Sequence, residues 1–395
     1  MPGLVYAEQN EALMTVRAEV RGELITWARE RARADLDDLS RRFPKLQQWE
    51  SEEVTPTLKQ LEAFAQATHA PLGFLFLPEP PEESVPLPDF RTMADAARRR
   101  PSPDLLDTLF QCEQRQEWYR DYGRANRDEP LSFVGSLDIT TSIVEAAATM
   151  GAALGFQVED RGARWADAFR KLTEQAEELG VLVMVNGVVG SNTHRKLNPQ
   201  EFRGFAMVDD IAPLIFVNGA DTKAAQIFSL AHELAHIWLG QSALSDVEVS
   251  STSGNTTERW CNEVAAEMLV PLHSLRDAFS AGRLLTDELD RLAREFKVST
   301  LVVLRRIHDA GHLTVEQYRS AYTAELDRVL GILGEGISSG GNFYNTQPVR
   351  VSRRFASAVI SSTLEGQTLY RDALQMLGIK KLSTFQELSH RLGIA

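Results

Sequence analysis

The chain has 395 residues, of which 43% are hydrophobic and 25% are charged, the composition of a soluble globular protein. Its length predicts two or three domains at roughly 150 residues each. The formal net charge of −13 excludes a protein that coats nucleic acid or an anionic membrane non-specifically, because neutralising phosphates requires clustered positive charge.

Cysteine usage and the lack of apolar segments indicate the compartment. Cys112 and Cys261 lie in unrelated segments, which excludes a disulfide framework and a cysteine-based metal cluster. The N-terminus has no basic region followed by an apolar run, as a secretory signal would. The most apolar stretch, 181–189, is far shorter than the roughly 20 residues of a membrane span. We therefore expect a cytoplasmic protein without a membrane partner.

The first part of the chain predicts a small all-α domain over residues 12–77. Thr57 and Pro56 mark the start of a helix over 58–68, since a threonine cap and an early proline favour helix initiation. Residues 78–104 are rich in proline and predict a linker.

The remaining chain predicts an α+β fold that is mainly helical. Further helices are expected over 105–122, 140–154, 165–179, 222–239 and 258–270. Strands are expected over 181–185, 205–208 and 212–217, forming a small antiparallel sheet packed on the helix 222–239. A polar loop is expected over 241–257. These elements divide into a domain over 105–275 and a helical C-terminal region over 276–395.

The central motif is His232-Glu233-Leu234-Ala235-His236, an H-E-x-x-H pattern inside the helix predicted over 222–239. Residues four apart project side by side from a helix, so His232 and His236 can bind one Zn²⁺ at about 2.0–2.1 Å each. Glu233 is then placed to act as general base toward a zinc-activated water that attacks a carbonyl. Two histidines and a glutamate on an apolar helix are costly to bury without a partner, which favours a metal site over a chance match.

A third ligand is expected from the next helix. The extended motif with a third histidine is absent, because Leu239 and Ser242 stand where its glycine and histidine would be. Glu258 and Asn262 share one face of the helix predicted over 258–270. This predicts Glu258 as the third metal ligand and Asn262 as a hydrogen-bonding residue that orients the ligands. Glu263 and Glu267 point elsewhere around the helix, and we expect both to be solvated.

These residues resemble the ImmA/IrrE metallopeptidase family. That family carries H-E-x-x-H followed by a helix of the form E-x-x-A-N-x-F-A-A-x-L-L-M-P. Cys261 and Val264 replace the usual Ala and Phe of that helix. The resemblance covers about residues 170–275 and is looser from 276 to 395.

The resemblance implies a zinc-dependent, gluzincin-like metallo-endopeptidase. His232, His236 and Glu258 would bind Zn²⁺, and Glu233 would be the catalytic base. Several members of the family cleave a helix-turn-helix repressor or an antitoxin and so switch on stress-response, mobile-element or phage genes. A protein substrate of that kind is the partner that the resemblance implies.

The segment 12–77 resembles a degenerate Xre-type helix-turn-helix domain. The pattern from Trp49 to Leu61 matches the third and fourth helices of that domain, but the turn and recognition helix are shorter by about four residues. Arg41, Arg42 and Lys45 are the candidate phosphate contacts of this segment. DNA binding and protein docking both stay open for this domain.

Two functions therefore agree with the sequence. The first is a zinc endopeptidase that cleaves a regulatory protein, with Glu233 as general base. The alternative is an antitoxin-like or transcriptional regulator that binds a toxin partner or DNA with little or no proteolysis. An intact motif with its glutamate favours the enzyme, because a binding protein has no need of the base.

Overall fold

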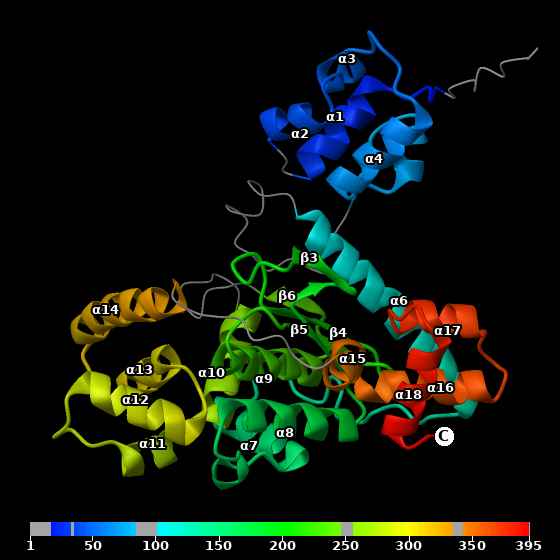
Figure 1. The fold of residues 1–395 in the computed structure, drawn as a ribbon. Helices are drawn as coiled ribbons and strands as arrows, with labels where there is room; N and C mark the ends of the chain where they lie inside the picture. Colours follow the sequence, from blue (N-terminus) through cyan, green and yellow to red (C-terminus); the bar gives the residue numbers. More distant parts are fainter. Residues whose placement is uncertain (1–16, 33–34, 84–100, 246–255, 335–342, 395) are drawn as a thin grey trace, which may run out of the picture. The chain divides into compact units, whose positions relative to one another are not determined.

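The computed structural model describes residues 17–32, 35–83, 101–245, 256–334 and 343–394, which form two compact units (Figure 1). The first unit contains the described residues up to 83 together with 101–106, and the second contains the described residues from 107 onward. Most of the linker predicted over 78–104 lies outside the described residues. The two units are described separately.

The first unit is all-α over its described part. Its elements are α1 (Gly22–Arg31), α2 (Leu36–Arg42), α3 (Leu46–Glu50), α4 (Leu58–Thr68) and the 3₁₀ helix η1 (Leu72–Phe76). The helix predicted over 58–68 is confirmed, because Thr57 and Gln60 form a capping box at its start. The rings of Phe43, Trp49 and Phe64 pack with centroids 5.6–6.3 Å apart and fix α2, α3 and α4 around one core.

The second unit is built on a four-stranded sheet with the order β1-β5-β4-β6. The strands are β1 (Leu182–Asn186), β4 (Gly204–Met207), β5 (Leu214–Asn218) and β6 (Ala243–Ser245). The predicted antiparallel sheet is wrong: β1 runs parallel to β5, while β4 is antiparallel to β5 and β6, so the sheet is mixed. Strand β6 falls in the segment predicted as a polar loop. A hairpin of β2 (Val188–Val189) and β3 (Asn192–Lys196) follows β1.

Helices cover both faces of this sheet, which explains why β1, β4 and β5 are buried throughout. Val183 and Val185 of β1 belong to the core that contains α8 (Trp165–Glu178) and α9 (Lys223–Leu239). Met184, between them, contacts Cys112 of α6 (Pro103–Asn126) at 3.9 Å. Successive side chains of a strand point to opposite faces, so α6 lies on the face away from α8 and α9.

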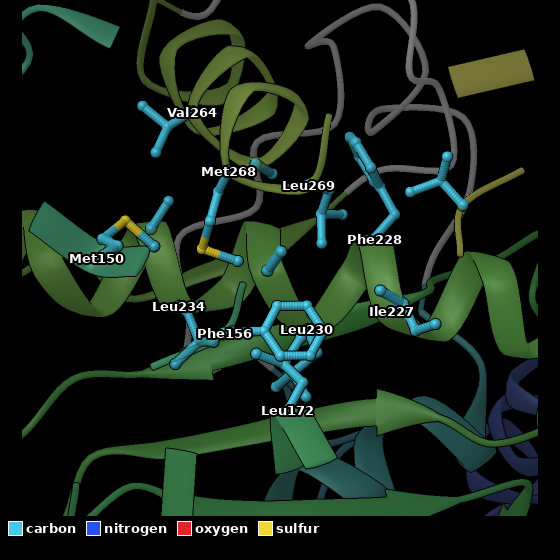
Figure 2. Packing of buried hydrophobic residues seen from close by; sticks show 14 of the residues in the cluster. Met150, Phe156, Leu172, Ile227, Phe228, Leu230, Leu234, Val264, Met268 and Leu269 are labelled. Carbon is cyan, nitrogen blue, oxygen red and sulfur yellow. The ribbon is translucent and has the colours of Figure 1, made fainter. Parts of the chain in front are cut away.

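The centre of the core is α9 (Figure 2). Leu230 and Leu234 of α9 face the sheet, while Val264 and Met268 of α10 (Thr256–Leu269) pack on the other side of α9. Helix α7 (Ile143–Leu154) in turn packs on α10. Because α9 is enclosed from both sides, every residue from Gln226 to Leu239 is buried.

The described part of residues 276–394 is helical, as predicted. It contains the end of α11 (Leu272–Ala278), then α12 (Leu285–Phe296), α13 (Thr300–Asp309), α14 (Val315–Gly334), α15 (Phe343–Val351), α16 (Arg353–Leu364), α17 (Tyr370–Met376) and α18 (Leu382–Leu392). Among the described residues, no helix is both long enough and apolar enough to cross a membrane.

A buried arginine fixes the end of α10. Arg161 donates to the carbonyl oxygens of Leu269 and Met268 at 2.5 and 3.1 Å, and to that of Phe296, the last residue of α12, at 2.8 Å. Carbonyls at helix C-termini have no partner within the helix and carry partial negative charge, so a buried cation stabilises both ends together. Arg161 thereby joins the C-terminal end of α10 to that of α12.

Glu177 of α8 joins the core to the N-terminus of α16 and makes stability depend on pH. Its carboxyl accepts hydrogen bonds from the Ser352 hydroxyl at 2.5 Å and the Arg353 amide at 2.9 Å. Burial raises the pKa of Glu177 to about 7, against the opposing effect of these hydrogen bonds. Because the folded-state pKa is above the unfolded value of about 4.5, the free energy of unfolding falls by about 3 kcal/mol as pH rises from about 4.5 to 7.

We expect Glu177→Gln to remove this dependence, since the amide oxygen still accepts both hydrogen bonds but carries no charge. The unfolding free energy of the variant minus that of the wild type should therefore be about 3 kcal/mol larger at pH 8 than at pH 4. Both free energies are measured by urea denaturation. The control is Glu178→Gln, because Glu178 is exposed on the same helix. Equal effects of the two variants at both pH values would contradict the assignment.

Candidate metal centre

Helix α9 positions the H-E-x-x-H residues. Its start is capped by Thr222, whose side chain accepts from the Ala225 amide, and it ends at Gly240 in the left-handed conformation. His232 and His236 are one turn apart on the same face, with ring centroids 4.8 Å apart and Nε2 atoms 3.1 Å apart. The helix therefore presents two imidazole nitrogens to one point in the core.

Helix α10 brings the third group. Ala265 is fully buried among the core residues that α9 and α10 share, and its small side chain allows the two helices to approach closely. Glu258, in the first turn of α10, then lies with its carboxylate oxygens 3.3 Å from His232 Nε2 and 3.0 Å from His236 Nε2. Three residues that the sequence analysis proposed as metal ligands thus converge in the structure.

The spacing of these three donors fits a metal ion. Donor atoms at about 2.0–2.1 Å from a tetrahedral Zn²⁺ lie about 3.3–3.4 Å from one another. The two imidazole Nε2 atoms are 3.1 Å apart; Glu258 Oε2 lies 3.3 Å from that of His232 and Glu258 Oε1 lies 3.0 Å from that of His236. The side chains of all three residues are at most 6% exposed. Two imidazoles and one carboxylate leave a fourth position for a reacting group, the pattern of a catalytic rather than a structural zinc site.

The charges of the site also suit a cation. Burial raises the pKa of Glu258, but the two imidazoles outweigh this and hold it well below its usual range. Burial lowers the pKa of His232, yet the carboxylate of Glu258 outweighs this and raises the pKa above its usual value. Burial lowers the pKa of His236, and neighbouring His232 adds to that decrease. Deprotonated imidazole and carboxylate are the forms that bind metal, and a cation offsets the cost of burying the anion.

The glutamate of the motif lies against strand β4. Glu233 directly follows His232 in the sequence, and its side chain is fully buried. A Cβ atom built on Gly204 would lie 3.0 Å from Glu233 Oε1, 3.2 Å from its Cγ and 2.9 Å from the carbonyl oxygen of Phe216. The absence of a side chain at Gly204 therefore makes the space that the Glu233 carboxylate occupies. A glycine inside a strand is a known signal of close approach, and the sequence analysis did not use it.

We expect Gly204→Ala to displace the Glu233 carboxylate without removing a metal ligand. Should Glu233 act as the catalytic base that its motif predicts, a displacement of about 1 Å would cost about 100-fold in rate, so kcat should fall by that order while zinc content stays at the wild-type level. The measurement is cleavage rate together with zinc content. Gly151→Ala is the control, because nothing lies within 4 Å of a Cβ at that position. An unchanged kcat in Gly204→Ala would contradict the role assigned to this glycine.

The other acidic and amide residues of α10 divide into three cases. Asn262 is half-buried and interacts with the side chain of His232, as the sequence analysis proposed. Glu263 is exposed, as expected. The expectation for Glu267 is wrong: it is buried, forms an ion pair with Arg306 and accepts from the Leu272 amide at 3.3 Å. Helix α13, which carries Arg306, covers the face of α10 that was expected to be open.

The candidate phosphate contacts lie in the first unit and form no comparable cluster. Arg41 and Arg42 are in the last turn of α2 and Lys45 precedes α3, and all three are exposed. Arg41 pairs with Asp38 at 3.2 Å, and the Arg42 guanidinium lies over the Phe43 ring at 5.3 Å. Helix α3, which follows Lys45, has five residues. These features describe an exposed basic edge with acidic neighbours.

The fold and the donor set together define a candidate metal centre, in which the helix with H-E-x-x-H packs between a sheet and the helix that contains Glu258. Comparison with family models agrees with this assignment: residues 176–308 match the peptidase family model described as the IrrE N-terminal-like domain. Residues 351–391 match a domain of unknown function, DUF8813. A search of curated proteins found no match. The IrrE-like match spans β1 to α13 and contains all of the metal-centre residues.

Proposed function

We propose that the chain is a zinc-dependent endopeptidase. The observation that carries the proposal is the convergence of His232, His236 and Glu258 beside Glu233, within the segment that matches the IrrE N-terminal-like domain. A protein that served only to bind a partner would need neither the three converging ligands nor an acid at the second position of the motif.

The residues present fit peptide hydrolysis. Zn²⁺ held by His232, His236 and Glu258 would act as a Lewis acid that lowers the pKa of water and polarises the scissile carbonyl. Glu233 accepts the proton that water loses as its oxygen bonds to the carbonyl carbon. Glu233 then delivers that proton to the amide nitrogen as the carbon–nitrogen bond breaks. The burial of Glu233 keeps its carboxylate in one place for both transfers.

We propose further that the substrate lies extended along β6. Strand β6 is at one edge of the sheet, whose order is β1-β5-β4-β6. Its neighbour β4 contains Gly204, against which Glu233 packs. An extended peptide can pair with an edge strand of a sheet through main-chain hydrogen bonds. A structure of the Glu233→Gln variant with a bound peptide tests this, and a helical peptide at the metal centre would exclude it.

The proposed substrate is a regulatory protein such as a repressor or an antitoxin. To test this, the Glu233→Gln variant is isolated from the cells that produce the protein naturally, together with the proteins bound to it. Each bound protein is then purified and incubated with zinc-loaded wild type. We expect wild type to cut one of them at a defined bond, while Glu233→Gln leaves it intact. The proposal is rejected if zinc-loaded wild type cuts neither the retained proteins nor a mixed peptide library.

The alternative function, a regulator that binds a toxin or DNA, depends on the first unit. The exposed Arg41, Arg42 and Lys45 favour it, whereas the five-residue α3 and the pairing of Arg41 with Asp38 weaken its DNA-binding form. Salt-dependent binding of the chain to a DNA duplex, lost on replacing these three residues, would support this function if no cleavage is found.

A further inference from the structure

An open pocket lies beside the metal centre, between α9, α10 and α13. Its apolar lining comes from Phe228 of α9, Ala266 of α10 and Val302 of α13. Phe228 lies on the side of α9 that faces α10 (Figure 2). The side chains of Phe228 and Val302 are buried and that of Ala266 is half-buried. Over the described residues, the apolar wall is therefore formed by side chains of three core helices.

Two residues that line the pocket are one helical turn from proposed metal ligands. Phe228 is one turn before His232 on α9, so their Cβ atoms are about 5–6 Å apart. Asn262, which also lines the pocket, is one turn after Glu258 on α10 and interacts with the His232 side chain. A peptide with its scissile carbonyl at the metal centre would thus place a neighbouring side chain at this opening.

The charges around the opening are balanced. Arg305 and Asp309 of α13 line it and form an ion pair at 2.9 Å. Arg259 and Glu263 of α10 line it as well, one turn apart and of opposite charge. With two cations and two anions at its rim and an apolar floor, the pocket offers no net attraction for a charged side chain.

The volume of the pocket limits which apolar side chains it can enclose. The space that the centre of a water-sized sphere can occupy in the pocket is about 40 Å³. Counted in the same way, one water molecule needs about 10–15 Å³, so the pocket has room for about three or four groups of that size. A leucine or methionine side chain has four heavy atoms, whereas a tryptophan side chain is far larger and glycine would leave the pocket empty.

We propose that this pocket binds an aliphatic side chain of leucine or methionine size next to the scissile bond of the substrate, so that Phe228, Ala266 and Val302 determine cleavage specificity. This inference rests on the proposed peptidase function. It adds the class of residue at which the enzyme cuts, which the metal centre itself does not specify.

The first test is the cleavage pattern of zinc-loaded protein on a mixed peptide library. We expect wild type to prefer leucine or methionine at one position beside the cut by about tenfold or more over glycine. Ala266→Leu fills the pocket and should abolish that preference, while Val302→Ala enlarges it and should shift the preference toward phenylalanine. Ala152→Leu, at an exposed position of α7, is the matched control and should leave the pattern unchanged.

The second test needs neither metal nor catalysis. Binding of N-acetyl-leucinamide and N-acetylglycinamide is compared by ligand-observed NMR in wild type, Ala266→Leu and Ala152→Leu. We expect the leucine compound to bind wild type and Ala152→Leu at least tenfold more tightly than Ala266→Leu, and the glycine compound to bind none of them measurably.

The outcomes separate this inference from the proposed function. Leucinamide binding that Ala266→Leu removes, with no cleavage of either the peptide library or the retained proteins, would support the pocket as a binding site and reject the peptidase. Cleavage with no aliphatic preference, or a preference that neither Ala266→Leu nor Val302→Ala alters, would overturn the pocket and leave the peptidase standing. The proposed role of the pocket would also be overturned if the protein neither binds leucinamide nor prefers aliphatic residues beside the cut.

Discussion

Replacing Glu258 with alanine is expected to reduce bound zinc from one per chain to almost none. Apparent binding free energies of zinc sites are about 10–16 kcal/mol, so each ligand contributes about 3–4 kcal/mol, or two to three orders of magnitude in affinity. Among the three proposed ligands, Glu258 alone carries negative charge, and its oxygens lie 3.0 and 3.3 Å from the two imidazole nitrogens. His232→Ala should have an effect of the same order.

The measurement is the metal content of purified protein after reconstitution with Zn²⁺ and removal of the excess. Glu263→Ala is the matched control, because Glu263 is on the same helix but exposed. It should keep one zinc per chain. Because Glu258 is buried, circular dichroism is used to check that the variants remain folded. If Glu258→Ala unfolds the chain, Glu258→Gln, which keeps the shape of the side chain, is measured in its place. Full zinc content in both Glu258 variants would remove Glu258 from the ligand set.

The parts of the site that depend on one helix could be predicted from the sequence. The side-by-side placement of His232 and His236 follows from helical geometry alone, and Thr222 and Gly240 are residue types that favour the start and the end of a helix. Glu258 required a second step, the packing of α10 on α9. That step was accessible because α10 has a small residue, Ala265, where it meets the core.

The parts that depend on contacts between distant segments could not be predicted. The direction of β1 was missed because sequence neighbours favour hairpins, whereas the hairpin partner of β5 is β4 and β1 joins the sheet from the other side. Burial of Glu267 depends on Arg306, 39 residues later, and the pocket floor depends on Val302 of the same helix. Periodicity within α10 contains no information about α13.

The catalytic part of the proposal predicts a large loss of activity in Glu233→Gln with no loss of zinc. Glutamine has the shape of glutamate and fits the space that Gly204 leaves, but its amide can neither accept the proton of the attacking water nor return it to the leaving nitrogen. General acid–base catalysis typically contributes 10²–10⁴-fold, so kcat should fall by about a thousandfold while KM changes little.

The comparison that isolates this effect is kcat on one identified substrate for wild type, Glu233→Gln and Glu178→Gln, each loaded with zinc. Glu178→Gln makes the same chemical change at an exposed position of α8, away from the metal centre and the pocket, and should keep wild-type activity. A raised KM with unchanged kcat in Glu233→Gln would assign this residue to substrate binding instead of proton transfer. Because Glu233 is not among the three converging metal ligands, loss of kcat at full zinc content distinguishes a missing base from a missing metal.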